Sequence, residues 1–486
     1  MTNPTPLPAA EHPIIPGFYP DPTICRVGDD YYLANSSFEY FPGAPIFHSR
    51  DLLSWKQIGN ILDRRSQFLR NNWWHSGGIY GSTLRHHDGR FYFVTTNVGE
   101  AGQLIVTAED PSGPWSDPVI VPGAAGIDPD LCWDESGQCY LTWKGFNDGN
   151  DGIFQARLDL ETGEFKGEAY PVWQGLGLAA PEAPHLYRIG EYWYLMLAEG
   201  GTERGHTVTI ARGERPEGPF EPCPDNPVFS HRSTAKPVQN TGHADLVQSP
   251  DGTWAAVYLA VRPGGFTPQF HVLGRETFLA GIEWVDGWPV FDEDRFQIPA
   301  TDTAFTDDFT GVGLDQRWVA PGSEPEAVVV GHPDGGVALQ EGAGPLCARI
   351  RDLRWGAEAV FSGSGRLGVL MDDRHVYGLN YAEGQVSAVV VIGGLRHELG
   401  SVPCPGEDVV LRIDAVDPRT EGASPVTIGP DDIVLSFDAG DGPRELGRFD
   451  GRYLSTEVTT GFTGRMLAVE AAGPGSRLQK VEYRPS

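Results

Sequence analysis

Three carboxylate residues stand beside prolines in the first half of the sequence. Asp21 and Asp128 each precede a proline, and Glu182 lies in Ala180-Pro-Glu-Ala-Pro184. Carboxyl groups donate and accept protons in hydrolytic reactions, and a pair of them on either side of a glycosidic bond is sufficient to cleave it. An Asp-Pro pair is also an ordinary turn former, so each acid alone is a weak indication of catalysis.

The three acids lie in a pattern that recurs five times before residue 300. Each copy has a small or acidic residue, an apolar strand, a glycine turn and an aromatic strand. The turn glycines are 61, 48, 53 and 62 residues apart, at Gly28, Gly89, Gly137, Gly190 and Gly252. One propeller blade of four short strands fits each interval. Recurrent hairpins of an ordinary β-sandwich are the alternative, because Asp-Gly hairpins are common in β proteins.

The repeat therefore predicts an all-β chain with a five-bladed β-propeller over residues 12–299, preceded by an N-terminal tail over 1–11. After about Pro299 the pattern stops, and short strand-like runs separated by turn residues follow. These runs show no helical period, so a lectin-like β-sandwich is expected over 303–486. The 62 glycines, 40 prolines and 11% aromatic residues agree with a turn-rich β protein.

Alignment of the five copies places one residue of each at the start of the innermost strand. The residues in this position are Asp21, Gly81, Asp128, Ala183 and His243. Glu182 precedes the position by one residue. The innermost strands of a propeller surround a central channel, where side chains of different blades meet. Three carboxylates and a histidine are therefore expected in one funnel.

The order of the blades suggests a role for each acid. In an inverting glycosidase the acid and base are about 6.5–9.5 Å apart, which for Asp21 and Glu182, two blades apart, implies a ring radius of roughly 3.5–5 Å. Asp128 and Glu182, on adjacent blades, would then be roughly 4–6 Å apart, so that ionised Asp128 helps Glu182 to stay protonated as the general acid. Asp21 stays ionised and activates a water as the general base.

The same segments resemble glycoside hydrolase family 43, the β-xylosidase and α-L-arabinofuranosidase family. Pro16–Pro22 resembles the motif of the base, Gly126–Pro129 that of the pKa-modulating aspartate, and Ala180–Pro184 that of the general acid. Further stretches resemble the two-domain β-xylosidases, namely Ser36–Gly43, Thr241–Ala244 and Gly274–Thr277. The resemblance implies inversion of the anomeric centre without a catalytic metal or a required cofactor.

Four substrate-binding residues follow from this resemblance. His243 would lie at the bottom of the funnel, Arg275 would contact sugar or the acid pair, and Phe38 would pack beside the substrate. In some relatives the histidine supports a bound calcium, so calcium could bind near His243. Phe462, in Thr459–Gly464, would form the tip of a loop that the sandwich lends to the rim. Plain structural roles are the alternatives for His243, Arg275 and Phe38.

One segment departs from the family pattern. Relatives usually carry Gly-Gly-Ile-Trp-Ala-Pro, whereas this chain has Gly-Gly-Ile-Tyr-Gly-Ser at residues 77–82. Tyr80 retains an aromatic platform, but the Gly-Ser pair is expected to loosen the loop beside the sugar. Trp73, Trp74 and Trp143 are candidates for stacking on sugar, with ordinary strand packing as the alternative.

The sequence thus predicts an exo-glycoside hydrolase that degrades xylan-type hemicellulose oligosaccharides from the non-reducing end. Terminal β-D-xylose is the first expectation and α-L-arabinofuranose the second. A retaining fructosidase fits less well, because its usual Asn-Asp-Pro-Asn-Gly motif differs from Tyr19-Pro-Asp-Pro-Thr23. A sugar-binding propeller without catalysis is a further alternative, although three intact acids argue against it.

Charge and composition limit the partners. A net charge of −30 disfavours binding to nucleic acid and to anionic membrane surfaces, so a small neutral oligosaccharide is the expected ligand. No apolar run approaches the roughly 18 residues of a membrane span, and the first residues lack the regions of a secretory signal. A cytoplasmic protein is predicted, which could form a homo-oligomer.

The six cysteines lack the spacing of a zinc site and are expected to be buried thiols. Cys132 and Cys139 flank one expected hairpin, across which they could pair in an oxidising compartment.

Overall fold

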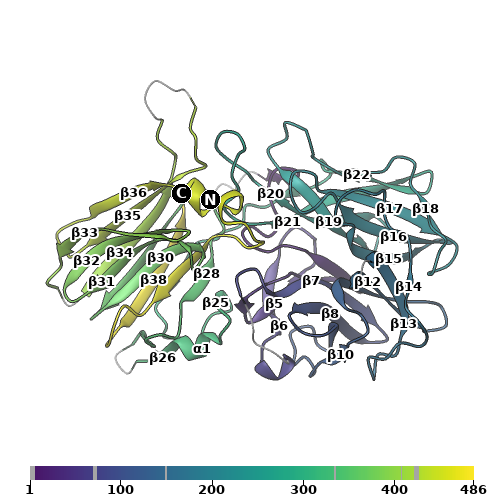
Figure 1. The fold of residues 1–486 in the computed structure, drawn as a ribbon, viewed down its shortest axis with the longest axis horizontal. Helices are drawn as coiled ribbons and strands as arrows, with labels where there is room; N and C mark the ends of the chain where they lie inside the picture. Colours follow the sequence, from purple (N-terminus) through teal and green to yellow (C-terminus); the bar gives the residue numbers. More distant parts are fainter. Residues whose placement is uncertain (1–5, 69–73, 148–149, 333–334, 407, 421–425) are drawn as a thin grey trace.

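The computed structural model describes residues 6–68, 74–147, 150–332, 335–406, 408–420 and 426–486. Nearly all of its elements are β strands, arranged in two bodies that lie side by side (Figure 1). The prediction of an all-β chain is confirmed. Within these described ranges, no helix is both long and apolar enough to cross a membrane.

The first body is a propeller of five four-stranded sheets. Blade 1 contains β2 (Thr23–Val27), β3 (Asp30–Ala34), β5 (Gly43–Ser49) and β6 (Lys56–Leu62). Blade 2 contains β7 (Gly78–His87), β8 (Arg90–Val98), β9 (Gln103–Ala108) and β10 (Val119–Val121). Blade 3 contains β11 (Gly126–Trp133), β12 (Cys139–Asn147), β13 (Asn150–Leu158) and β14 (Tyr170–Pro171). Blade 4 contains β15 (Glu182–Ile189), β16 (Tyr192–Glu199), β17 (Thr207–Gly213) and β18 (Glu221–Pro222). Blade 5 contains β19 (Gln239–Gln248), β20 (Trp254–Val261), β21 (Glu276–Val285) and β22 (Trp288–Asp292).

Apolar layers hold neighbouring blades together. Alternate residues of a strand point to opposite faces of its sheet, so each blade offers one face to either neighbour. Blades 1 and 2, for example, share a cluster that includes buried Ile46 and Leu84. Cys139 lies in the layer between blades 2 and 3, and Cys132 packs in the layer between blades 3 and 4. The two thiols therefore point to opposite faces and stay unpaired, as do the other four cysteines.

The second body consists of two eight-stranded sheets around a common apolar core. One sheet contains β24 (Phe305–Asp307), β26 (Val329–Gly331), β27 (Val337–Leu339), β29 (Trp355–Ser362), β34 (Asp408–Val416), β35 (Asp432–Asp438), β36 (Arg444–Asp450) and β38 (Arg477–Pro485). The other contains β4 (Tyr40–Phe41), β25 (Trp318–Pro321), β28 (Leu346–Arg349), β30 (Gly365–Asp372), β31 (His375–Ala382), β32 (Gln385–Ile392), β33 (Leu395–Pro403) and β37 (Met466–Glu470). The short helical elements are η1 (Arg65–Gln67), α1 (Pro325–Val328), η2 (Gly451–Leu454) and α2 (Thr456–Thr459).

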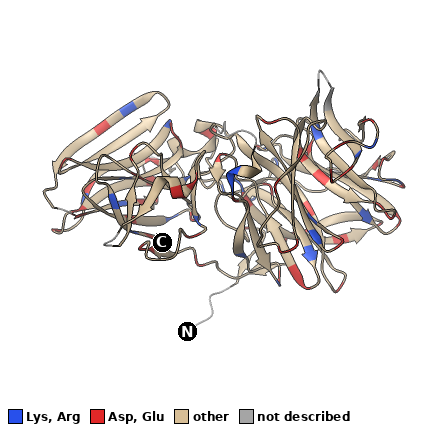
Figure 2. Cartoon of the chain, turned by 90° about the horizontal axis from the view of Figure 1, so that it is seen from below, with Lys and Arg blue, Asp and Glu red and all other residues tan. Residues whose placement is uncertain are grey.

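Two short strands cross the expected domain boundaries. β4 belongs by sequence to the propeller, yet Phe41 pairs with Ala320 at the edge of a sandwich sheet. β1 (Leu7–Pro8) pairs with β23 (Gln297–Ile298), so the end of the predicted tail 1–11 is a strand held by the end of the propeller. Both bodies carry acidic and basic residues on strands and loops (Figure 2).

A buried polar network fills the channel below the first residues of the blades. Arg85 of blade 2 donates to Asp245 of blade 5 (2.8 Å) and to Asp130 of blade 3 (2.9 Å). Asp245 also accepts hydrogen bonds from Thr23 of blade 1 (2.8 Å) and from the Tyr187 hydroxyl of blade 4 (2.6 Å). Both carboxylates are fully buried. The network therefore connects all five blades across the axis.

Loss of Arg85 should destabilise the propeller. Arg85→Ala leaves two buried carboxylates without their cation, which costs about 3–5 kcal/mol of the free energy of unfolding. Urea unfolding followed by tryptophan fluorescence measures this loss. Arg90→Ala, at an exposed position of the same blade, is the control and should stay within about 0.5 kcal/mol of the wild type. A loss below about 1 kcal/mol for Arg85→Ala would show that the ring closes without the network.

Candidate active site

The residue that the five sequence copies align at one position has a left-handed backbone conformation in four of the blades. The φ angles are 51° at Asp21, 52° at Asp128, 50° at Ala183 and 46° at His243. In blades 3, 4 and 5 the strand pairing shifts at this point, as in a β-bulge. Such bulges re-aim a side chain, and non-glycine residues with positive φ cluster at functional sites. The position aligned from sequence therefore has a left-handed backbone conformation in four of the five blades.

The bulges surround a small cavity at the mouth of the channel. All three predicted acids line it, together with five of the predicted substrate-binding residues and three further residues. The predicted group consists of Asp21, Asp128, Glu182, His243, Phe38, Tyr80, Arg275 and Phe462, and the further residues are Gly81, Ile127 and Thr202. Residues from both bodies therefore converge on one site.

Asp21 lies in a strongly polar environment. Its carboxylate accepts from Arg275 Nη1 (2.8 Å) and Ser36 Oγ (2.6 Å), and His243 Nδ1 lies 3.4 Å away. Burial alone would raise the pKa of Asp21, but Arg275, His243 and the Ser36 hydrogen bond lower it below its ordinary value. Asp21 is therefore an ionised carboxylate that can accept a proton.

Asp128 has the opposite electrostatic environment. Burial and the negative charges of Glu182 and Asp21 raise its pKa well above the ordinary value, although the Ala183 N–H donates to Oδ2 at 3.1 Å. The sequence predicts an ionised Asp128 beside a protonated Glu182, whereas the raised pKa of Asp128 favours its protonated form. Two interacting carboxyls titrate together, so their two pKa values describe the pair and not either residue alone.

Gly81 makes room for Asp128. A Cβ atom at this position would lie 2.3 Å from Asp128 Oδ1 and 2.9 Å from His243 Cε1. The Gly-Ser pair was expected to loosen the loop beside the sugar, but residues 78–87 form the continuous strand β7. The Tyr80 hydroxyl donates to the Ser76 carbonyl at 2.8 Å. The glycine therefore permits a close approach in an ordered strand.

Phe462 closes the cavity from the sandwich side. Its ring stacks on Phe38 at 5.6 Å, and Tyr80 meets it edge-on at 5.8 Å. The Phe462 N–H donates to Ser76 Oγ at 2.9 Å, which fastens the sandwich loop to the propeller. The Arg275 guanidinium lies 5.5 Å from the ring centres of both Phe38 and Phe462. The predicted rim loop thus forms a wall of the site.

Two of the predicted tryptophan platforms, Trp74 and Trp143, are not part of this cavity. Trp143 is fully buried, packs against Phe154 and Phe165, and donates to the Ala125 carbonyl. The prediction that it stacks on sugar is wrong, because the strand pattern does not reveal which residues the neighbouring blade covers. Trp74 is 52% exposed but does not line the cavity. Trp73 lies outside the described residues.

Calcium near His243 stays a prediction. Calcium takes six to eight oxygen ligands, whereas the neighbouring carboxylate of Asp21 is already bound by Arg275 and Ser36. Among the described residues, no group of three or more His, Cys, Asp or Glu side chains is arranged to hold a metal. Burial, with the nearby positive charges, lowers the pKa of His243 to about 3. His243 is therefore a neutral imidazole beside Asp21.

Sequence reasoning missed Ser36 and Thr202. Ser36 begins the segment Ser36–Gly43 that resembles the family, so its position was visible but its contact with Asp21 was not. Thr202 follows Gly200 and Gly201, a glycine pair that signals a loop after a strand, and it accepts from Arg275 Nη1 at 3.2 Å. Both residues come from loops whose approach to the channel depends on the tertiary fold.

A larger cavity of ≈410 Å³ adjoins the small one between the propeller and the sandwich. The two cavities share Thr202, Arg275 and Phe462. His271 and Glu457 line the larger cavity and form an ion pair of 2.7 Å across the two bodies. The site therefore joins a small cavity that contains the acids to a larger one between the two bodies.

Comparison with known proteins agrees with this geometry. The family model of glycosyl hydrolases family 43 matches residues 10–289. The chain belongs to this family. The resemblance seen in the motifs is thus confirmed, and with it the propeller fold. A "Xylosidase/arabinosidase" of Butyrivibrio fibrisolvens is 48% identical over 58% of this chain and 56% of its own length. A "Non-reducing end alpha-L-arabinofuranosidase BoGH43B" of Bacteroides ovatus is 47% identical over 58% of this chain and 53% of its own.

The match therefore spans only about half the length of these curated relatives. Solved family 43 structures cover both bodies. The Bacteroides ovatus structure named "Xyloglucan PUL GH43B" superposes with a TM-score of 0.86 at 33% identity, over 98% of this chain and 99% of that one. A xylan beta-1,4-xylosidase of Bacillus halodurans superposes with a TM-score of 0.86 at 26% identity, over 98% and 99%.

The close approach at Gly81 yields a prediction for this family 43 protein. Gly81→Ala should displace the Asp128 carboxylate and lower kcat/KM for glycoside hydrolysis by roughly 10- to 100-fold, as misplaced groups in active sites do. Steady-state kinetics measures the loss, with the melting temperature as a check of folding.

Gly59→Ala provides the matched control. A Cβ at Gly59 would meet its neighbours only at 3.7 Å or more, so kcat/KM should not change. Wild-type kinetics for Gly81→Ala would show that the position of Asp128 does not depend on the missing Cβ.

Proposed function

We propose that this protein is an inverting exo-glycosidase that removes terminal pentose from short hemicellulose oligosaccharides. The observation that carries the proposal is the contrast between the ionised Asp21 and the proton-retaining pair of Asp128 and Glu182 in one cavity. A hydrolase that inverts needs one carboxylate to take a proton and one carboxylic acid to supply it. β-D-Xylose is the first candidate for the released sugar and α-L-arabinofuranose the second, in line with the names of the relatives.

Each acid has a separate task in the proposed reaction. Asp21 takes a proton from the water that attacks the anomeric carbon, while Arg275 and Ser36 hold its carboxylate in place. Glu182, which is half-buried at the edge of the cavity, donates a proton to the departing oxygen. Asp128 opposes the ionisation of Glu182 by charge repulsion, so the pair holds one proton, which Glu182 passes to the glycosidic oxygen.

The shape of the site supports removal of a terminal residue. The acids lie in the small cavity, which the Phe462 loop and Tyr80 close on the side of the sandwich. The adjoining cavity of ≈410 Å³ can receive the rest of the oligosaccharide.

The stereochemistry of the product tests the mechanism. Proton NMR during hydrolysis of p-nitrophenyl β-D-xyloside should show α-xylose as the first released sugar, because inversion converts a β-linkage into an α-hemiacetal. The same measurement on an α-L-arabinofuranoside, with rates for the two p-nitrophenyl glycosides side by side, ranks the two sugars. First release of β-xylose would contradict inversion. Binding of xylo-oligosaccharides without release of reducing sugar would instead favour the non-catalytic alternative.

The role of Glu182 predicts dependence on the leaving group. Glu182→Ala should lower kcat by roughly 10²–10⁴-fold on xylobiose, which needs a proton on its leaving oxygen. The loss should be much smaller on an aryl xyloside with an acidic leaving group. Kinetics on both substrates measures the difference. Equal losses on the two substrates would contradict a general-acid role. Glu191→Ala, at an exposed position of the same blade, is the control and should match the wild type.

A further inference from the structure

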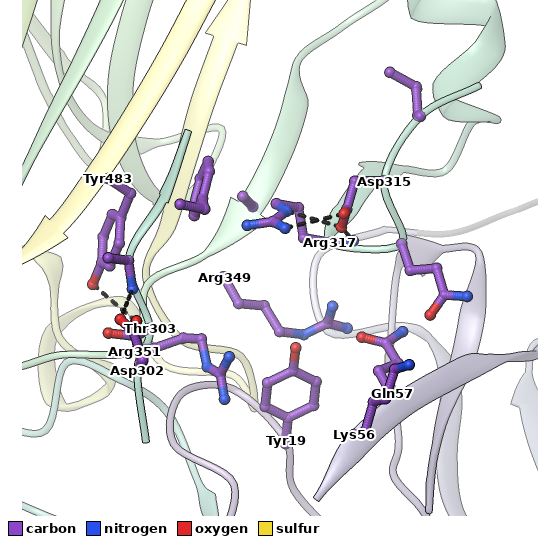
Figure 3. Close-up of a pocket in the computed structure, with 15 residues that line it drawn as sticks. Tyr19, Lys56, Gln57, Asp302, Thr303, Asp315, Arg317, Arg349, Arg351 and Tyr483 are labelled. Atoms are coloured by element: carbon purple, nitrogen blue, oxygen red, sulfur yellow. Dashed lines mark hydrogen bonds and ion pairs between the residues drawn. The ribbon is translucent and has the colours of Figure 1, made fainter. Parts of the chain in front are cut away.

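A second cavity, of ≈520 Å³, lies between blade 1 and the sandwich and contains none of the residues that line the active-site cavity (Figure 3). Tyr19, which precedes β2, forms one wall, and Lys56 of β6 lies at another side. Arg349 at the end of β28 and Arg351, two residues further on, enter from the sandwich. The side chains of a glycosidase site are not gathered here. The cavity is instead rich in cations.

Arg349 has an unused hydrogen-bond donor in this cavity. Its side chain is buried, at 6% exposure, and its Nε donates to the Phe18 carbonyl at 2.8 Å. Its Nη2 is also buried, yet it has no acceptor among the described residues. The guanidinium lies 4.7 Å from the centre of the Tyr19 ring. A buried charged donor without an acceptor is costly, so this position favours a ligand that supplies one.

The charges near Arg349 are not balanced by the protein. Arg351 donates to the Pro16 carbonyl at 3.2 Å, and within the described part of the chain neither arginine forms an ion pair with a carboxylate. Arg317, by contrast, makes two hydrogen bonds to Asp315, of 2.8 and 3.0 Å, drawn as dashed lines in Figure 3. Asp302 is the other carboxylate of the lining and is exposed. The cavity therefore keeps a positive charge in a chain of net charge −30.

We propose that this cavity binds an oxyanion, either the carboxylate of a sugar acid or inorganic phosphate. Guanidinium groups bind both through paired N–H donors, and such charge-assisted hydrogen bonds are stronger than neutral ones. Arg349, Arg351 and Lys56 all place positive charge on the same cavity. The ligand would also brace the segment Pro16–Asp21, because both arginines hold its backbone carbonyls.

Isothermal titration calorimetry on the full chain tests the proposal. The active site is first saturated with xylose. Inorganic phosphate, D-glucuronate and, as the neutral comparison, further D-xylose are then titrated into this protein. Phosphate or glucuronate should bind, and Arg349→Gln should weaken binding at least about ten-fold, the loss expected for a hydrogen bond between charged groups. Arg351→Gln should weaken it in the same direction. Arg90→Gln, which removes one exposed charge elsewhere, should not.

Each outcome decides a point. Binding of phosphate alone assigns the site to inorganic anions, and binding of glucuronate assigns it to carboxylates of sugar acids. Absence of binding by both anions, or wild-type affinity in Arg349→Gln and Arg351→Gln, overturns the proposal. If Arg349→Gln fails to fold, Arg351→Gln decides the question, since the Arg351 guanidinium donates to the Pro16 backbone carbonyl and to no side chain of the described residues. A rise in melting temperature with phosphate in the wild type, absent in Arg351→Gln, is the second readout.

Discussion

The buried contacts of Arg85 with Asp130 and Asp245 are the interaction on which the ring geometry depends. Arg85 enters the axis from blade 2, and the two carboxylates come from blades 3 and 5. Surrounding cations and donors lower the pKa of Asp245, although burial opposes this. Thr23, Asp130 and Asp245 each stand two residues after the first residue of their blade. The layer that contains Thr23, Asp130 and Asp245 therefore determines where the layer that contains Asp21, Asp128 and His243 lies.

Asp21 and Asp128 show how residues at the same position of two blades can have different protonation states. Asp21 and Asp128 share a φ angle near 50°, but their neighbours differ. Arg275 and Ser36 lower the pKa of Asp21, whereas burial and Glu182 raise that of Asp128. Bulges in blades 3, 4 and 5 aim the side chains, and the charges beside the ring shift the pKa of each carboxyl. The repeated backbone therefore places the carboxyl groups, and their different neighbours separately set their different pKa values.

The repeat made the channel residues predictable, because Asp21, Asp128 and His243 precede similar strands at similar positions. It could not reveal electrostatics, and so it assigned the charge to Asp128. Trp143 was misjudged because alternation along a strand shows two faces but not which one a neighbouring blade covers. Arg85 went unnoticed, since only the closed ring brings it to Asp130 and Asp245. Contacts between residues distant in sequence account for most of what was missed.

The second body affects the base and not only the rim. Arg275 lies between Phe38 of the propeller and Phe462 of the sandwich while it holds Asp21. The two rings exclude water from the guanidinium, and an ion pair strengthens as the surrounding dielectric constant falls. The loop that carries Phe462 is itself held by Ser76 of the propeller. Displacement of the sandwich loop would therefore weaken the contact that lowers the pKa of Asp21.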